Sequence, residues 1–327
     1  MTDNYCRTAC TTIACALLTV CAVAPTLAQT FPDRPVRIVV GLPPGGGVDF
    51  IARVLAQKLS ESWPQQVVVD NRAGANGIIA TELVAKSKPD GITLLMVNTS
   101  HAINPAFYPK LPYDSLTDFD PITLVAQYPF LLIAHPGLPA RSLKELITLA
   151  KAKPGQVVYG SPGNSSAPHL GMEIFTELAH INMLHVTYKG AGPAITDIIS
   201  GETQVMLLNL APIQNLLKAG RLRALVVAGP TRTGALPNVP TSAEEGFPGF
   251  NVLGWYALLA PAGTPGAIRT KLHDDVVKAL RTDEVTKRFT GDNNEVVGGT
   301  PEELLAFLKR EIAQNTAVVK RAGIKPD

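Results

Sequence analysis

Residues 36–59 constrain this chain most, because they predict a strand, a glycine-rich loop and a helix in succession. The β-branched run from Val36 to Val40 ends at a glycine, which is typical of a strand end. Three consecutive glycines, Gly45 to Gly47, follow, and apolar residues at helical spacing come after them. Backbone N–H groups of such a loop and the positive end of the helix dipole face the same space. We therefore expect this loop to bind an anion.

The loop lacks the spacing of the common nucleotide-binding motifs. A dinucleotide fingerprint needs a third glycine where Phe50 stands, and no Gly-Lys-Ser/Thr follows to make a P-loop. Glycine-rich turns also occur simply as tight connections between a strand and a helix. The alternative interpretation is therefore a structural turn that binds nothing.

Residues 1–28 have the composition of an export signal. A weakly positive start precedes a short apolar stretch, and small residues stand at cleavage-site spacing before Gln29. All four cysteines lie in this segment, so the mature chain would lack disulfides, a thiol nucleophile and cysteine metal ligands. The alternative is a lipoprotein cut before Cys21, although Val20 is larger than the residue such sites prefer. We expect a cleaved, soluble protein in the periplasm.

Composition argues against several classes of partner. The formal net charge of the 327-residue chain is only +2, which favours neither nucleic acid nor an anionic membrane surface. After the signal, no run of the sequence reaches the roughly 18 apolar residues of a membrane helix. The six histidines lack the spacing of a metal motif, so we expect no metal and no cofactor.

Strand and helix signals alternate through the rest of the chain, which predicts two compact α/β lobes. Two apolar runs, Ile122–Val125 and Phe130–Ala134, mark the crossing into the second lobe, and Asn251–Leu259 marks the return. Pro105 and the prolines after it predict an irregular connection. Two crossing strands would form a hinge. The expected division is residues 29–127 and 253–327 in one lobe and residues 128–252 in the other.

Glycine, serine, threonine and asparagine crowd the carboxyl ends of the predicted strands in both lobes. These ends form the ligand crevice of open α/β sheets. Hydroxyls and backbone N–H groups, with little full charge, suit a small carboxylate. The residues concerned are Gly45–Gly47, Asn98–Ser100, Ser161–Ser166 and Asn209.

Many short motifs, in order along essentially the whole mature chain, resemble the Bug (TctC-type) receptors of tripartite tricarboxylate transporters. They are specific for the family and much less specific for the ligand. They include Phe31-Pro32-Asp33-Arg34-Pro35, Pro43-Pro44-Gly45-Gly46, Asn71-Arg72-Ala73-Gly74-Ala75-Asn76-Gly77, His101-Ala102-Ile103-Asn104-Pro105, Tyr188-Lys189-Gly190 and Ala260-Pro261-Ala262-Gly263-Thr264-Pro265.

The resemblance implies an extracytoplasmic solute-binding receptor, not an enzyme, with a type II-like periplasmic-binding-protein clamshell of mainly parallel sheets flanked by helices. Such a receptor would be monomeric. It would hand a dicarboxylate, tricarboxylate or aromatic carboxylate to the membrane subunits of a transporter. Amides, hydroxyls and bridging waters would hold the ligand. Carried onto this chain, the ligand-binding residues are Pro44, Gly45, Gly46, Gly47, Asp49, Asn98, Thr99, Ser100, Gly163, Asn164, Ser165 and Asn209.

One departure from the family concerns the run Gln204–Leu208, where many relatives carry an acidic residue and a phenylalanine. We interpret this run as an apolar wall of the cleft, which argues against an amino-acid ligand because an ammonium group would want a carboxylate partner. Ser115 is expected in a turn outside the cleft.

Several site residues have a second interpretation. Asp49 can cap its helix or complement the helix dipole, and Asn98 to Ser100 can serve as turn formers. Ser165, with His169 as its base, would make an exported serine hydrolase that acts on carboxylic acids. The second glycine of a nucleophile elbow is missing, however.

Two aromatic residues of the return crossing, Trp255 and Tyr256, also allow two interpretations. They suit the core of a hinge strand better than a platform on which a ligand stacks. We therefore expect both side chains to be buried.

Overall fold

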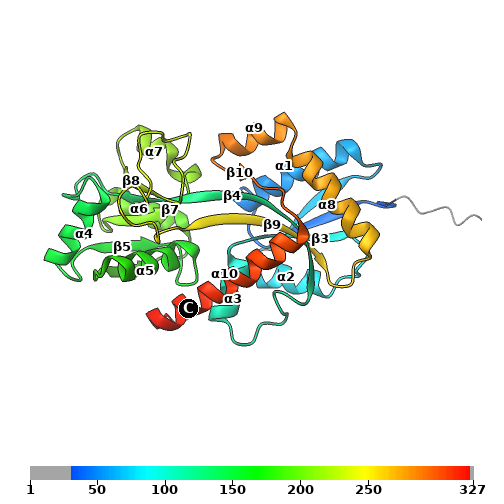
Figure 1. Cartoon of the computed structure of the whole chain (residues 1–327), viewed down its shortest axis with the longest axis horizontal. Helices are drawn as coiled ribbons and strands as arrows, with labels where there is room; N and C mark the ends of the chain where they lie inside the picture. Colours follow the sequence, from blue (N-terminus) through cyan, green and yellow to red (C-terminus); the bar gives the residue numbers. More distant parts are fainter. Residues whose placement is uncertain (1–30, 325–327) are drawn as a thin grey trace, which may run out of the picture.

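The computed structural model describes residues 31–324, which form two β-sheets that share one long strand (Figure 1). In the first sheet, β9 (Leu253–Pro261) lies between β3 and β4 (Phe119–Ala134) and is antiparallel to both. A short strand, β10 (Glu295–Val296), pairs with β4 on its other edge. The parallel part has the order β2-β1-β3 and consists of β1 (Val36–Val40), β2 (Val67–Asn71) and β3 (Thr93–Asn98).

The second sheet is built on the last residues of β4. These residues pair antiparallel with β7 (Val205–Leu208) and with β8 (Arg223–Ala228). β5 (Val158–Ser161) lies between β7 and β6 (Leu184–Thr187) and is parallel to both. The carboxyl ends of β5 and β7 therefore meet at one edge of this sheet, as those of β1 and β3 do in the first.

β4 is a single strand of 16 residues, so the two apolar runs predicted on either side of the crossing are continuous. It pairs with β9 as far as Pro129 opposite Leu253, and Phe130 already pairs with Ala228 of the second sheet. β4 and β9 run side by side across the middle of the molecule (Figure 1). The lobe boundaries given above remain a prediction, and the predicted signal peptide lies outside the described residues.

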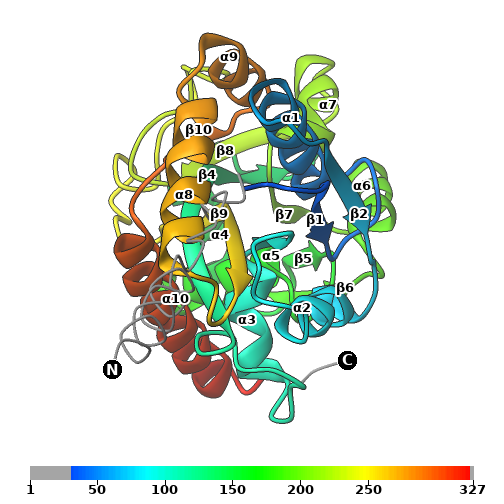
Figure 2. The same ribbon diagram turned by 90° about the vertical axis from the view of Figure 1, so that its right-hand side faces the viewer.

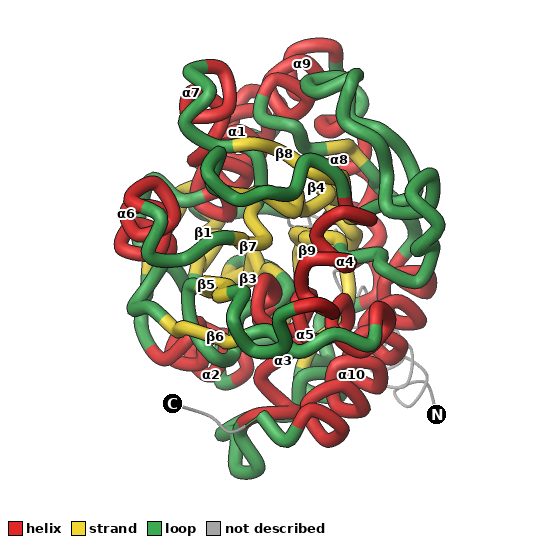
Figure 3. The backbone as a smooth tube through the Cα atoms, turned by 90° about the vertical axis from the view of Figure 1, so that its left-hand side faces the viewer, coloured by secondary structure: helices red, strands yellow, loops and turns green. Residues whose placement is uncertain are grey.

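Helices surround the strands, which gather in the middle of the molecule (Figure 3). No helix within residues 31–324 is long and apolar enough to cross a membrane. We call the first sheet and the helices that accompany it the first half of the molecule, and the second sheet with its helices the second half. The helices of the first half are α1 (Gly47–Ser62), α2 (Ile78–Ala85), α3 (Ser100–Phe107), α8 (Gly266–Leu280), α9 (Asp283–Gly291) and α10 (Pro301–Ala322). Those of the second half are α4 (Leu143–Ala152), α5 (Ala167–Ala179), α6 (Ala191–Ser200) and α7 (Gln214–Lys218).

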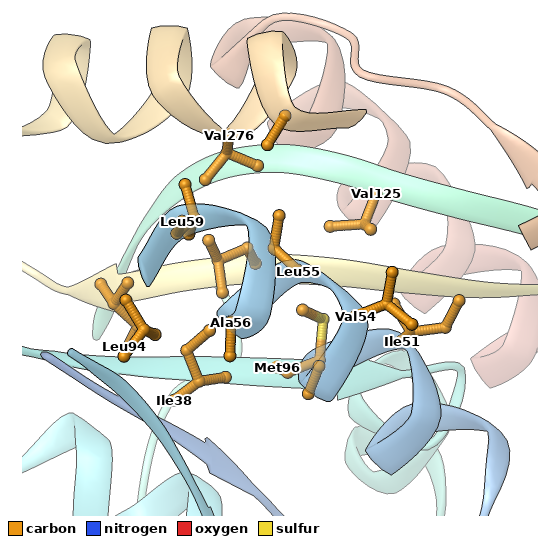
Figure 4. Packing of buried hydrophobic residues seen from close by; sticks show 14 of the residues in the cluster. Ile38, Ile51, Val54, Leu55, Ala56, Leu59, Leu94, Met96, Val125 and Val276 are labelled. Atoms are coloured by element: carbon orange, nitrogen blue, oxygen red, sulfur yellow. The ribbon is translucent and has the colours of Figure 1, made fainter. Parts of the chain in front are cut away.

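The apolar stripe of α1 is buried against the first sheet, as its spacing predicts. Ile51, Leu55 and Leu59 are fully buried, and Figure 4 shows them packed among side chains of the strands and of α8. α9 lies beside α1 at one end of the molecule (Figure 2). Each fully buried leucine or isoleucine contributes about 1.5–3 kcal/mol, so this stripe fixes where the amino terminus of α1 points.

The segment around Pro105 corrects one expectation. Pro105 lies inside the helix α3, whereas the predicted irregular connection begins after it, at residues 108–118, and contains Pro109 and Pro112. Proline has no N–H to donate to the carbonyl of His101 four residues earlier. That carbonyl instead accepts a hydrogen bond from the Ser115 hydroxyl at 3.2 Å. The tertiary contact replaces the missing helical bond, which allows the helix to continue.

Candidate functional site

The loop before α1 presents an open helix amino terminus. Residues Pro43 to Gly47 are exposed. Gly46 is the N-cap residue, with φ −82° and ψ 170°, and no side chain caps the helix there. Gly45 has φ +85°, a conformation that glycine adopts without strain. No side chain therefore caps the exposed start of α1, and its first N–H groups have no intrahelical acceptor, as an anion site requires.

Asp49 lies beneath this loop, and its side chain is 3% exposed. Its Oδ2 accepts hydrogen bonds from the Gly45 amide and from Arg53 Nε, both at 2.9 Å, and its Oδ1 accepts one from Asn71 Nδ2 at 3.0 Å. Burial alone would raise the pKa of this carboxyl. The hydrogen bonds from Arg53, Gly45 and Asn71 outweigh burial and hold the pKa below its ordinary value.

Asn71 completes the support of the loop from the end of β2. Its Nδ2 also donates to the Leu42 carbonyl at 3.0 Å, and its Oδ1 accepts from Arg53 at 3.1 Å. These bonds connect β2, the loop and the first turns of α1. Sequence reasoning found Asp49 but missed Arg53 and Asn71, although an acid and a base four residues apart on a helix are a common pair.

Asn98, Thr99 and Ser100 follow β3 directly, as predicted, but they face different ways. Asn98 and Ser100 line a small cavity of about 20 Å³ beneath the loop that begins at Gly41. That volume is enough for one water molecule. Thr99 instead lines a larger groove on the side of α10. The structure thus places Asn98 and Ser100 beside the two ends of the glycine loop, at Leu42 and Val48, and separates Thr99 from them.

Asn76 belongs to the same constellation and was missed as a candidate. Its Oδ1 accepts a hydrogen bond from Ser100 Oγ at 3.0 Å, and its Nδ2 donates to Asn104 Oδ1 at 2.9 Å. Asn76 has φ +50°, a left-handed conformation that asparagine tolerates better than most residues. The glycines that flank it in the sequence were the available signal for this tight loop.

The loop after β5 carries the second group of predicted residues, Gly163 to Ser165. The helix cap of α5 is Ser166, whose Oγ accepts from the His169 amide at 3.3 Å and donates to the Gly163 carbonyl at 2.7 Å. The Asn164 carbonyl contacts His169 Nδ1 at 2.5 Å. Ser165, between these structural contacts, is partly exposed at the amino terminus of α5.

A stack of aromatic rings supports this loop from below. The rings of His169 and His185 are 3.9 Å apart, and Tyr159 stacks on His185 at 4.7 Å. His185 Nε2 also contacts the buried Ser161 Oγ at 2.7 Å. His169 directs Nδ1 to a backbone carbonyl and stacks on another histidine. His169 Nε2 lies 3.7 Å from Glu173 Oε1, so these contacts of His169 hold the loop after β5 against α5.

The run before Asn209 is not a wall of the cleft, which corrects the interpretation above. Val205 and Leu207 pack into one hydrophobic core of the second half, and Met206 and Leu208 pack into another on the opposite face of β7. All four side chains are buried. Only Asn209, which follows β7 and is partly exposed, lies at the strand end where the loop after β5 also begins.

The two halves meet where α3 and α5 begin. Ile103 of α3 and Leu170 of α5 share a buried cluster with the end of α10. Thr99 and Ala167, which stand at the starts of α3 and α5, line the same groove of about 1270 Å³. The loops after β3 and β5 thus reach the same junction from opposite halves of the molecule.

Three residues outside the proposed site were also interpreted from sequence. Tyr256 and Trp255 are buried, as predicted for a crossing strand. Ser115 lies in a turn, as predicted. It is also 5% exposed, and its carbonyl oxygen lies 2.9 Å from His101 Nε2. Ser115 therefore supports the first turn of α3.

Residues 51–324 match the family described as tripartite tricarboxylate transporter family receptor. The chain is 38% identical over 306 residues to Protein BugT of Bordetella pertussis, an alignment that covers 92% of this chain and 93% of BugT. The match to the family covers most of the described chain. It confirms the resemblance seen in the short motifs.

Solved structures of related proteins share the fold. R. palustris Rpa4515 with adipate has a TM-score of 0.81 and 36% identity, covering 91% of this chain and 100% of that chain. MatC (Rpa3494) from Rhodopseudomonas palustris with bound malate has a TM-score of 0.76 and 31% identity, covering 88% and 100%. The predicted two-lobe α/β fold is confirmed. The chain belongs to the receptor family of tripartite tricarboxylate transporters and is a solute-binding receptor, not an enzyme.

Proposed function

We propose that this receptor captures a small dicarboxylate between its two lobes in the periplasm and delivers it to the membrane subunits of a tripartite transporter. In this proposal the protein acts as a monomer after its signal peptide is removed near Gln29. Residues 29–127 and 253–327 form one lobe, residues 128–252 form the other, and β4 and β9 form the hinge between them.

The observation that carries the proposal is the open amino terminus of α1. Gly46 and Gly47 are exposed there and no side chain caps them, while Gly45 donates its N–H to Asp49, the only acidic residue of the first turn, which is buried beneath the loop and paired with Arg53. A carboxylate that approaches the loop therefore meets backbone donors and not the Asp49 charge. Desolvating a carboxylate requires several such donors.

The second lobe supplies the opposing contacts. Ser165 and Asn164 stand at the start of α5, and Asn209 follows the neighbouring strand β7. Asn98 and Ser100 complete the site from the first lobe. A ligand with a carboxylate at each end can engage both lobes at once, which would stabilise the closed form. The carboxylates adipate and malate in the related structures are dicarboxylates of this kind.

Thermal unfolding in the presence of single carboxylates tests this function. The panel contains adipate, malate, a tricarboxylate, an aromatic monocarboxylate and the amino acid glutamate. A ligand at about 100 times its Kd stabilises the folded state by roughly 2.7 kcal/mol. We expect a dicarboxylate to raise the melting temperature and to be recovered unchanged after incubation. Consumption of the ligand would contradict the proposal and favour an exported hydrolase.

A further inference from the structure

The crossing of β4 and β9 places one tyrosine against both halves of the molecule. Tyr128 stands in β4 opposite Gly254 of β9, just before the strand passes from the first sheet to the second. Its ring contacts hydrophobic cores of both halves. The ring centroid lies 5.4 Å from that of Phe130, which is buried in the second half. The position of Tyr128 therefore depends on how the two halves are arranged relative to each other.

Glycine at position 254 makes this placement of Tyr128 feasible. A Cβ added to Gly254 would lie 2.0 Å from Tyr128 Cζ and 2.4 Å from its hydroxyl oxygen. The ring thus lies directly across the backbone of β9. Any side chain at position 254 would push the ring away, because atoms this close cannot coexist.

Tyr256 connects Tyr128 to the start of α1. The two rings pack against each other, with centroids 5.3 Å apart and an interplanar angle of 33°. Burial raises the pKa of Tyr128 to about 12, so this phenol keeps its proton at neutral pH. A Cβ added to Gly47 would lie 2.2 Å from the Tyr256 hydroxyl oxygen. The hydroxyl therefore touches the first residue of the helix whose amino terminus forms the proposed site.

We propose that Tyr256, held by Tyr128, is a positioning residue that sets the first turn of α1 and makes the geometry of the anion-binding loop depend on the hinge. This inference rests on the proposed function for what the loop binds, but the contact itself does not. In this proposal, the absence of a side chain at Gly47 allows Tyr256 to pack there and also leaves access for a ligand. A relative rotation of the halves would shift Tyr128, and the shift would reach Gly47 through the packed rings of Tyr128 and Tyr256.

Four variants test the contact without any ligand: Gly47→Ala, Tyr256→Phe, the two combined, and Tyr113→Phe as the matched control. Tyr113 is buried in the same half and packs against His101 and Phe119. Its buried hydroxyl lacks a hydrogen-bond partner among the described residues, so Tyr113→Phe reports the loss of a tyrosine hydroxyl elsewhere in this half. Hydrogen exchange is measured by mass spectrometry on the peptide that spans residues 42–50. Loss of the hydroxyl that packs against Gly47 should loosen the first turn of α1, and we expect about 2- to 10-fold faster exchange in Tyr256→Phe.

The combined variant gives the more specific prediction. Gly47→Ala alone should accelerate exchange in this peptide, because its methyl group collides with the hydroxyl. Removing that hydroxyl leaves the methyl 3.3 Å from the nearest ring carbon, a tight contact that a small shift relieves. We therefore expect Tyr256→Phe to restore much of the protection in the Gly47→Ala background.

Additivity of the two substitutions, or exchange like the parent in every variant, would overturn the inference. Adipate and malate affinities are measured on the same proteins. If the parent binds neither compound, the proposed function fails while the exchange result still decides the positioning role. If the parent binds and Tyr256→Phe is weakened about 2- to 10-fold while Tyr113→Phe is not, the two proposals are supported together.

Discussion

The Gly45 amide donates a hydrogen bond of 2.9 Å to Asp49 Oδ2, so a buried carboxylate holds the glycine loop from beneath. The same oxygen accepts from Arg53, and the other accepts from Asn71 at the end of β2. The sequence offered two roles for Asp49, helix capping or ligand contact. The hydrogen bonds show a third role, which is to fix the loop so that its outward N–H groups stay in place.

Replacing Asp49 by asparagine should weaken this support. One oxygen remains to accept from Gly45 and Arg53, but the amide nitrogen then faces the donor Nδ2 of Asn71. We expect a loss of about 1–3 kcal/mol in the free energy of unfolding, the scale for a buried group left unsatisfied. Urea denaturation measures it. Glu61→Gln is the control, because Glu61 forms an exposed pair with Lys58 on the same helix and should cost less than about 1 kcal/mol. Equal effects of the two substitutions would contradict the supporting role.

Ser165→Ala tests the contribution of the second lobe. If Ser165 donates to a ligand carboxylate, the variant should lose about 1.5–3 kcal/mol of binding free energy, or roughly 10- to 150-fold in affinity. Ser200→Ala, at the exposed carboxyl end of α6, should bind like the parent. Titration calorimetry with adipate and malate decides the matter. Parental affinity in Ser165→Ala would remove this residue from the site.

Acid should destabilise the protein through His101. Burial lowers the pKa of His101 to about 4, which a hydrogen bond to the Ser115 carbonyl only partly offsets. The histidine of the unfolded chain has a pKa near 6.5. Between about pH 6.5 and pH 4 the unfolded chain therefore binds a proton at this residue and the folded state does not. Stability falls as the pH drops from about 6.5 to about 4, by up to roughly 3 kcal/mol. The difference in unfolding free energy between the parent and His101→Gln, followed against pH, should show this slope. A constant difference would contradict it.

Export is tested on the mature protein. We expect the chain isolated from the periplasm to begin near Gln29 and to carry none of the four cysteines. Intact mass and amino-terminal sequencing measure this directly. A lipidated chain that begins at Cys21 would show that the alternative cleavage site is used.

Local features of the fold could be predicted because they depend on residues close in the sequence. The strand at Val36–Val40 and the helix α1 with its buried apolar stripe were predicted from β-branched composition and helical spacing alone. The same holds for the turn from β1 to α1. These signals need only a few neighbouring residues, and they are strong here.

The contacts that define the site were less accessible from sequence. The bond between Asn71 and Asp49, and the contact of Tyr256 with Gly47, join segments far apart in the chain. No periodic pattern of residues in the sequence indicates these two contacts. The misreading of Met206 and Leu208 has a related cause, since a short apolar run looks the same in a cleft wall and in a core. Pro105 was misjudged because Ser115 supplies the missing hydrogen bond from outside the helix.

The central claim, that a carboxylate binds at the amino terminus of α1, is tested most directly by calorimetric titration of Gly46→Val with adipate and malate. Gly46 has φ −82°, and a Cβ there would meet nothing closer than the Pro43 carbonyl at 3.7 Å, so the fold should accept valine. Gly234→Val, where a Cβ also has open space, is the control. We predict that the parent and Gly234→Val bind one of these carboxylates, whereas Gly46→Val keeps its melting temperature but loses binding. Parental affinity in a folded Gly46→Val protein would contradict the account.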